Sequence, residues 1–137
     1  MNIADLPNCP AWLQEATTHN ADVSLDTQGD VTWHGGEFLG GEFQGGEFLG
    51  GSFLGGYFRG GSLLGAPLVA SASVRSNGHG ECGRTLYAIR TTAATYYRCG
   101  CFWGSRKDLV AYIVAGDEKY VASRCNALRH VDAMLRL

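Results

Sequence analysis

Phenylalanine recurs at every fifth residue of a glycine-rich run from Gly36 to Gly60, which reads GEFLG, GEFQG, GEFLG, GSFLG and GYFRG. A period of five fits neither the 3.6-residue period of an amphipathic helix nor the two-residue period of a strand. The paired glycines between the blocks weaken both elements further. The pattern therefore predicts a repeating fold in which each block contributes one inward side chain. The inward positions are Trp33, Phe38, Phe43, Phe48, Phe53, Phe58, Leu63 and Leu68.

With GSLLG and APLVA, seven consecutive blocks keep this register over residues 36–70. The blocks resemble those of the pentapeptide-repeat family, in which four blocks form one square coil. The resemblance implies that residues 31–69 form a short right-handed quadrilateral pentapeptide-repeat β-helix of under two full coils. The chain departs from the family in using glycine where alanine is commoner. It also uses glutamate or serine where aspartate or asparagine is commoner.

Four blocks per coil imply that side chains twenty residues apart stack at about the 4.8 Å spacing of neighbouring strands. The stacked pairs would be Trp33 with Phe53, Phe38 with Phe58, Phe43 with Leu63 and Phe48 with Leu68. Fewer than two coils bury little interior, so the repeat needs a cap at each end.

The flanking segments are the expected caps, which makes the whole chain a mixed β-helix plus α+β fold. Residues 1–30 predict a helical N-terminal cap with a short helix beginning near Pro10. Residues 70–84 are rich in serine, glycine and asparagine, which predicts a loop. Residues 85–137 predict a β-β-α-α domain that caps the other end.

Within this C-terminal domain, Thr85–Thr92 and Thr95–Trp103 are rich in threonine, tyrosine and isoleucine and predict two antiparallel strands. Ser105 and the acid three residues later form a capping pattern for the first helix, which Gly116 ends. A second helix is expected from about Asp117, with apolar residues along one stripe.

Charge divides the chain into two halves. Up to Gly65 there are eight acids and one base, a net −7; from Ala66 there are five acids and ten bases, a net +5. No basic leader or long apolar run appears, so we expect a cytoplasmic protein without a membrane segment. The difference in charge between the two halves affects the choice of partners and association rates more than it affects the fold.

The acidic half suggests a partner-binding site formed by Glu37, Glu42 and Glu47, with Asp30 nearby. Consecutive blocks lie on consecutive faces of a square coil, so the glutamates would form a partial ring. Pentapeptide-repeat proteins include DNA mimics that inhibit topoisomerases, and the resemblance implies the same alternative here. A solvated polar face that only keeps the coil soluble is the simpler interpretation.

The segment GCFWGS at 100–105, followed by a short helix, looks like segments in small phage and prophage accessory proteins. That resemblance implies a non-catalytic, phage-encoded inhibitor of the anti-CRISPR type. It would block a basic nucleic-acid-binding surface of a host CRISPR surveillance complex in the host cytosol. We expect no cofactor, no metal and no direct nucleic-acid binding, and a monomer or weak homodimer.

Five cysteines in a chain without a leader favour reduced thiols over disulfides. Gly100–Gly104 is similar to the nucleophile motif of peptide-methionine sulfoxide reductases, which makes a thiol-dependent reductase using Cys101 an alternative function. Alternation along a strand would place Cys99 on the same face as Cys101. His79, Cys82, Cys99 and Cys101 are also weighed as a zinc site, against buried thiols and a loop histidine.

Two further sets of residues invite a partner. Outward leucines and a valine follow several inward positions, and we expect the C-terminal domain to cover them or a partner to bind them. These residues are Leu39, Leu49, Leu54, Leu64 and Val69. Basic residues in the second half could bind nucleic acid or pair with the acidic half. They are Arg75, Arg84, Arg90, Arg98, Arg106, Lys107, Arg124, Arg129 and Arg136.

Overall fold

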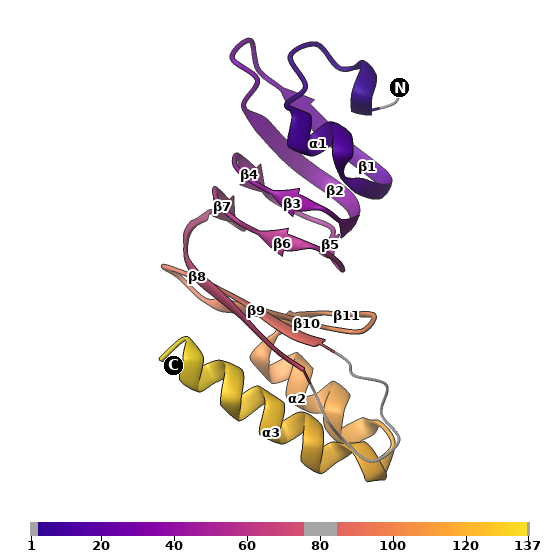
Figure 1. Ribbon diagram of the computed structural model, residues 1–137, viewed down its shortest axis with the longest axis vertical. Coiled ribbons are helices and arrows are strands. Elements are labelled where there is room, and N and C mark those ends of the chain that lie inside the picture. The colour runs from indigo at the N-terminus through magenta and orange to yellow at the C-terminus, as the bar shows by residue number, and fades with distance from the viewer. Residues whose placement is uncertain (1–2, 76–84, 137) are drawn as a thin grey trace. The chain divides into compact units, whose positions relative to one another are not determined.

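The computed structural model describes residues 3–75 and 85–136, in which short strands predominate (Figure 1). The helices are the 3-10 helix Ile3–Asp5, α1 (Ala11–Glu15), α2 (Arg106–Ala115) and α3 (Glu118–Met134). The strands are β1 (Thr17–Leu25), β2 (Val31–Gly40), β3 (Glu42–Phe43), β4 (Glu47–Phe48), β5 (Ser52–Phe53), β6 (Tyr57–Phe58), β7 (Ser62–Leu63), β8 (Ala66–Arg75), β9 (Thr85–Thr91), β10 (Thr95–Cys99) and β11 (Phe102–Ser105). The chain divides into two compact units, Met1–Leu68 (unit 1) and Val69–Leu137 (unit 2).

In the described residues, nine strands form one mixed sheet in the order β1-β2-β4-β7-β8-β9-β10-β11, with β5 also paired to β2. β3 and β6 form a separate pair. Pairing is parallel among β2, β4, β5 and β7 and antiparallel between β1 and β2, β7 and β8, and β9 to β11. The fold is therefore mostly sheet and of the α+β class. The prediction of a right-handed quadrilateral pentapeptide-repeat β-helix with helical and β-β-α-α caps is wrong.

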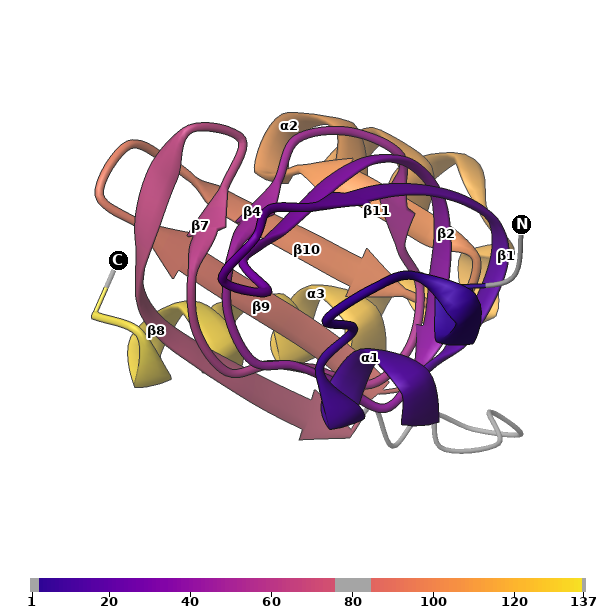
Figure 2. The ribbon, with the colours of Figure 1, turned by 90° about the horizontal axis from the view of Figure 1, so that it is seen from above.

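Unit 1 repeats with a period of fifteen residues, not twenty. Thr32 of β2 pairs with Glu47 of β4, fifteen residues later, and Glu47 pairs with Ser62 of β7. On another side, Glu42 of β3 pairs with Tyr57 of β6. Three five-residue blocks therefore complete one turn of the chain, and Figure 2 shows successive turns of unit 1 one beneath another.

The inward rings stack in columns at this fifteen-residue spacing. The stacked pairs are Trp33 with Phe48 (centroids 5.5 Å apart, planes at 11°), Phe38 with Phe53 (5.0 Å, 9°) and Phe43 with Phe58 (5.0 Å, 10°). Rings of successive blocks meet edge to face, as Phe43 and Phe48 do at 5.7 Å and 85°. The prediction of inward residues is confirmed from Trp33 to Leu63, all of which are buried. The predicted twenty-residue stacks are wrong.

Glycine at the first position of each block explains the tighter turn. Gly51 and Gly56 have φ of +79° and +76°, which side chains rarely adopt. A Cβ on either residue would overlap the carbonyl oxygen of the glycine fifteen residues earlier, Gly36 or Gly41. The block therefore contributes no second inward side chain, and three aromatic rings per turn fill the interior.

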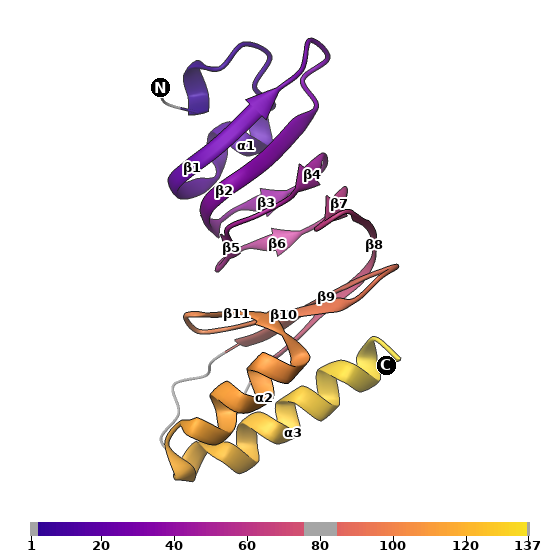
Figure 3. The same ribbon diagram turned by 180° about the vertical axis from the view of Figure 1, so that it is seen from behind.

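The N-terminal segment of unit 1 contains a short helix and a long strand, whereas the sequence predicts only a helical cap. Helix α1 lies against the first turn of the repeat, where Trp12 meets Phe43 edge to face at 4.9 Å and Leu13 is buried. Thr17–Leu25 then pairs antiparallel with β2 (Figure 3). The register of this pair shifts at three places. Apolar and polar residues do not alternate strongly in this segment, so the sequence does not predict β1.

The predicted loop at 70–84 is wrong for residues 70–75, which belong to strand β8. It covers Ala66–Arg75, and its first two residues pair antiparallel with Ser62 and Leu63. Serine and alanine are tolerated in this strand, most of whose residues are exposed or partly buried. The remainder of the predicted loop, 76–84, lies outside the described residues.

Unit 2 packs α2 and α3 on one face of the antiparallel β9–β10–β11 sheet (Figure 1). The single strand expected at Thr95–Trp103 is wrong, because Gly100 (φ +59°) turns the chain and makes a hairpin. The predicted helix boundaries are confirmed. The Asp108 N–H donates to Ser105 Oγ (3.2 Å) at the start of α2, Gly116 ends that helix, and Asp117 caps α3.

A polar network joins β10, α2 and α3 of unit 2. The Tyr97 hydroxyl of β10 donates to Asp132 Oδ1 of α3 at 2.6 Å. Arg106, the first residue of α2, donates from Nε to Asp132 Oδ2 at 2.9 Å. Burial, followed by the hydrogen bond to Asp132, raises the pKa of Tyr97 well above its ordinary value. This network fixes both helices to the sheet.

Candidate partner-binding surface

The structure does not bring the three predicted glutamates together. Glu37 lies on the β2 segment that pairs with β5, Glu42 on β3, and Glu47 on β4. Since three blocks complete one turn, these consecutive blocks occupy three different sides of unit 1. A partner that binds one side therefore meets only one of the three carboxylates.

Two of these carboxylates have basic or polar neighbours. Glu37 Oε1 lies 3.4 Å from Nδ1 of His19, on the adjacent strand β1. Glu42 Oε1 lies 3.5 Å from Nε of Arg59, and the Gln44 side-chain amide donates to Oε2 at 3.0 Å. Arg59, the one lysine or arginine of unit 1, therefore offsets the charge of Glu42.

Glu47 is exposed and differs from the other two. Among residues 3–75 and 85–136, no side chain makes an ion pair with its carboxylate. Asp30, also exposed, lies two residues before Thr32, the residue that pairs with Glu47. The register therefore places Asp30 and Glu47 on the same side of unit 1.

A third acid, Asp26, adjoins Asp30. The backbone N–H groups of Gln28 and Asp30 donate to Asp26 Oδ1, both at 2.9 Å. These bonds, chiefly that from Asp30, lower the pKa of Asp26 below its ordinary value and keep it ionised. Sequence reasoning missed Asp26, although Asp-Thr-Gln-Gly at 26–29 has the turn signature of aspartate first and glycine fourth.

Exposed leucines lie beside Glu47. Leu49 and Leu64 directly follow β4 and β7 and remain 43% and 45% exposed. Their backbone N–H groups donate to Trp33 and Phe48, so both belong to the same ladder as Glu47. We call Asp30, Glu47, Leu49 and Leu64 the Glu47 side. Leu39 and Leu54 share a different side, that of Glu37.

The geometry gives little support to the two cysteine hypotheses, a thiol-dependent reductase and a zinc site. Cys99 is buried at the end of β10, whereas Cys101 is exposed in the turn that follows, so the prediction that they share a strand face is wrong. Two members of the proposed zinc set, His79 and Cys82, lie outside the described residues. Within the described part of the chain, no three histidine, cysteine or acidic side chains cluster as metal ligands.

Several of the predicted basic residues have partners inside unit 2. Arg90 donates to the Leu135 carbonyl at 2.8 Å, and the Arg98 guanidinium lies 4.6 Å from the Tyr87 ring centroid. Arg106 bonds Asp132, and Arg124 is buried. These guanidinium groups therefore contribute to the structure of unit 2 itself.

Comparisons with protein-family models, with curated proteins and with solved structures each found no match. Over the described residues, none of the helices has both the length and the apolar composition needed to cross a membrane.

Proposed function

We propose that this chain is a non-catalytic binding protein that applies the Glu47 side of unit 1 to a basic surface of another macromolecule. The observation that carries the proposal is the pairing, on one side, of exposed carboxylates with two exposed leucines. The surrounding unit has a net charge of −7, so its field favours approach to a basic partner.

The two residue types have separate roles in this proposal. Asp30 and Glu47 occupy sites on a lysine- or arginine-lined surface that would otherwise hold phosphates. Leu49 and Leu64 contribute apolar area that becomes buried, which a phosphate chain cannot do. The combination predicts tighter binding than charge alone would give and a weaker dependence on salt than that of DNA.

The specific partner that we propose is the target-DNA surface of a host CRISPR surveillance complex, with the protein encoded by a phage and acting in the host cytosol. The charge polarity of the chain and the resemblance of GCFWGS to phage accessory segments support this choice. The proposed binding site contains Asp30 and Glu47. Glu37 and Glu42 lie on other sides of unit 1, so substitutions there serve as controls.

Two double variants with the same net charge test the proposal. Asp30→Asn with Glu47→Gln removes two charges from the Glu47 side, and Glu37→Gln with Glu42→Gln removes two from the other sides. Inhibition of target-DNA binding is measured for each with purified surveillance complexes. We expect at least a tenfold loss for the first variant, about 1.4 kcal/mol, and less than threefold for the second.

Equal losses in the two variants would mean that net charge acts without a defined side. Failure of the wild-type protein to inhibit any complex in the panel would remove the CRISPR partner. Gyrase supercoiling inhibition, measured in parallel, would then assign the topoisomerase alternative. Turnover of methionine sulfoxide that disappears in Cys101→Ser would contradict the non-catalytic proposal altogether.

A further inference from the structure

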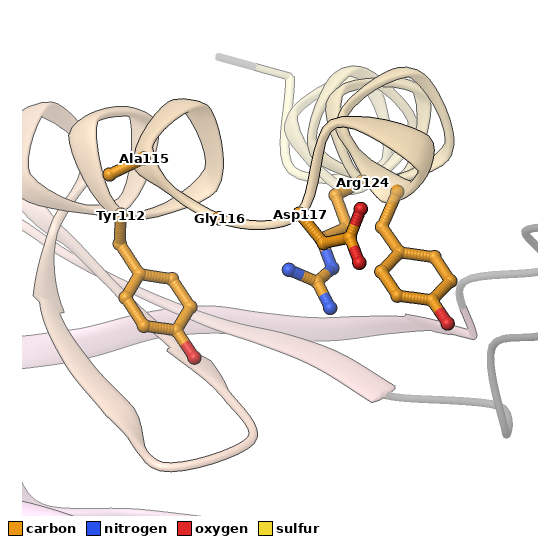
Figure 4. Close-up of a pocket in the computed structure, with 6 residues that line it drawn as sticks. Tyr112, Ala115, Gly116, Asp117 and Arg124 are labelled. Carbon is orange, nitrogen blue, oxygen red and sulfur yellow. The ribbon is translucent and has the colours of Figure 1, made fainter.

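Unit 2 contains a pocket of about 400 Å³ where α2 ends and α3 begins. It is lined by Tyr112, Ala115, Gly116, Asp117, Tyr120 and Arg124 (Figure 4). In this view the Tyr112 ring extends from α2, and the Arg124 side chain extends from α3 into the space beside Asp117. The volume lies within the range of small-molecule sites.

Arg124 supplies the positive charge in the lining of this pocket. Its side chain is charged at every physiological pH, yet the residue is only 7% exposed. Its guanidinium carbon lies 5.1 Å from the ring centroid of Tyr120, one helical turn earlier. A buried guanidinium in a pocket wall presents planar N–H donors whose geometry matches an oxyanion.

The two tyrosines give the pocket aromatic walls. Tyr112 is 36% exposed, and Tyr120 is partly buried. A flat ring can pack against such side chains at the same time as its charged substituent meets the guanidinium.

Asp117 restricts the charge that the pocket can accept. Its carboxylate accepts the Lys119 N–H at 3.2 Å and lies 3.9 Å from Lys119 Nζ, at the exposed rim. This fixed negative charge beside Arg124 opposes a second negative charge on a ligand. A monoanion therefore fits the site better than a dianion.

We propose that this pocket binds a small aromatic monocarboxylate, with the carboxylate on Arg124 and the ring against Tyr112 and Tyr120. The site belongs to unit 2, and the proposal is independent of partner binding by unit 1. The proposal is one of binding and assigns no reaction to the pocket.

Gly116 gives a variant that narrows the pocket without removing the guanidinium. Its φ is −80°, which alanine adopts without strain. A Cβ at this position would lie 3.2 Å from a guanidinium nitrogen of Arg124 and 3.3 Å from the Ile113 carbonyl oxygen. Gly116→Ala therefore narrows the pocket beside Arg124, whereas Arg129→Gln removes an exposed arginine from the same helix as a control.

The experiment is a titration of the full chain with phenylacetate, followed by backbone amide NMR shifts. Phenylacetamide and phenyl phosphate are the neutral and dianionic comparisons. We expect saturable shifts confined to residues 112–124, with at least tenfold weaker binding of phenylacetamide and severalfold weaker binding of phenyl phosphate. Arg124→Gln is expected to weaken phenylacetate binding at least tenfold, Gly116→Ala and Tyr112→Leu at least threefold, and Arg129→Gln less than twofold.

Absence of saturation by phenylacetate up to about 10 mM would overturn the proposal. So would binding of phenylacetamide with equal affinity, or an equal loss in Arg129→Gln. If Arg124→Gln does not fold, Gly116→Ala and Tyr112→Leu decide the matter. Unchanged affinity in both would contradict a ligand in this pocket.

Discussion

The cores of the two units bury aromatic side chains in different ways. In unit 1 the same arrangement repeats, and each of these aromatic rings stacks on the ring fifteen residues away. Unit 2 has a core without a repeat, in which the buried Tyr97 is held by Asp132 and Arg106 from two helices. Specificity therefore comes from backbone geometry and ring volume in unit 1, and from a directional polar network in unit 2.

The buried polar atoms show the same contrast. In the described part of the protein, Trp33 Nε1 is the one buried side-chain nitrogen or oxygen that lacks a hydrogen-bond partner. Its indole stands at a position that phenylalanine or leucine occupies in the later turns. In unit 2 the buried Tyr97 hydroxyl has its partner at 2.6 Å. Each unit should therefore respond to a different kind of substitution.

The largest effect is expected from Phe53→Ala. Phe53 is fully buried and stacks on Phe38, so its removal leaves a cavity and costs about 3–5 kcal/mol of unfolding free energy. Leu54→Ala, at the partly exposed next residue, should cost about 1 kcal/mol. Urea unfolding gives both values. Hydrogen exchange should lose protection in unit 1 and not in unit 2; equal loss in both would mean that the cores are one cooperative system.

Gly51→Ala should follow, with a cost of about 2–4 kcal/mol. The left-handed φ and the overlap with the Gly36 carbonyl oxygen both oppose a Cβ. Gly45→Ala is the matched control, because no atom lies within 4 Å of a Cβ there, and it should change stability by less than about 1 kcal/mol. Similar values for the two variants would contradict the glycine explanation of the fifteen-residue turn.

The repeat could be predicted from the sequence because its period and inward residues depend only on local spacing. The number of blocks per turn could not, since closure depends on the volume inside the turn. Glycine at 51 and 56 removes one inward side chain per block, and the remaining rings fill a three-sided interior. Both the predicted square turn and the observed turn place Glu37, Glu42 and Glu47 on successive sides. With three blocks per turn instead of four, the three glutamates occupy every side of unit 1 and share none.

In unit 2, capping residues located both helices to within a residue, as Ser105, Gly116 and Asp117 show. The hairpin at Gly100 was missed because Tyr96 to Trp103 reads as one continuous β-prone run. The Arg124 pocket was missed for a different reason. It depends on α3 packing against the end of α2, which a pattern of single residues does not encode.

Asp132→Asn is the corresponding test of unit 2, at about 1–3 kcal/mol. The amide weakens the bond from Tyr97 and removes the ion pair to the half-exposed Arg106. Asp108→Asn, on the exposed first turn of α2, is the control and should cost less than about 1 kcal/mol. Thermal unfolding checks both. A cost for Asp132→Asn no larger than that of the control would show that packing alone fixes the helices.

Alkaline pH should destabilise unit 2 through Tyr97. Its pKa is raised in the folded protein by burial and by Asp132, whereas the unfolded side chain ionises near pH 10. Above about pH 10 the unfolded state binds fewer protons than the folded state, so stability falls as pH rises, by up to about 1.4 kcal/mol per pH unit. In Tyr97→Phe the unfolding free energy should fall less steeply with pH, by the contribution of one proton. An unchanged slope would contradict the assignment of this pH dependence to Tyr97.

The smallest effect is expected from Trp33→Phe, although it also truncates a fully buried ring. The substitution loses stacking area on Phe48, but it also removes a buried N–H that has no acceptor, whose desolvation costs about 1–3 kcal/mol. The two effects oppose each other, so the change should be within about 1 kcal/mol of zero, by circular dichroism in urea. A cost approaching that of Phe53→Ala would mean that ring volume alone governs this column. In that case the unpaired indole would add nothing to the contrast between the two cores.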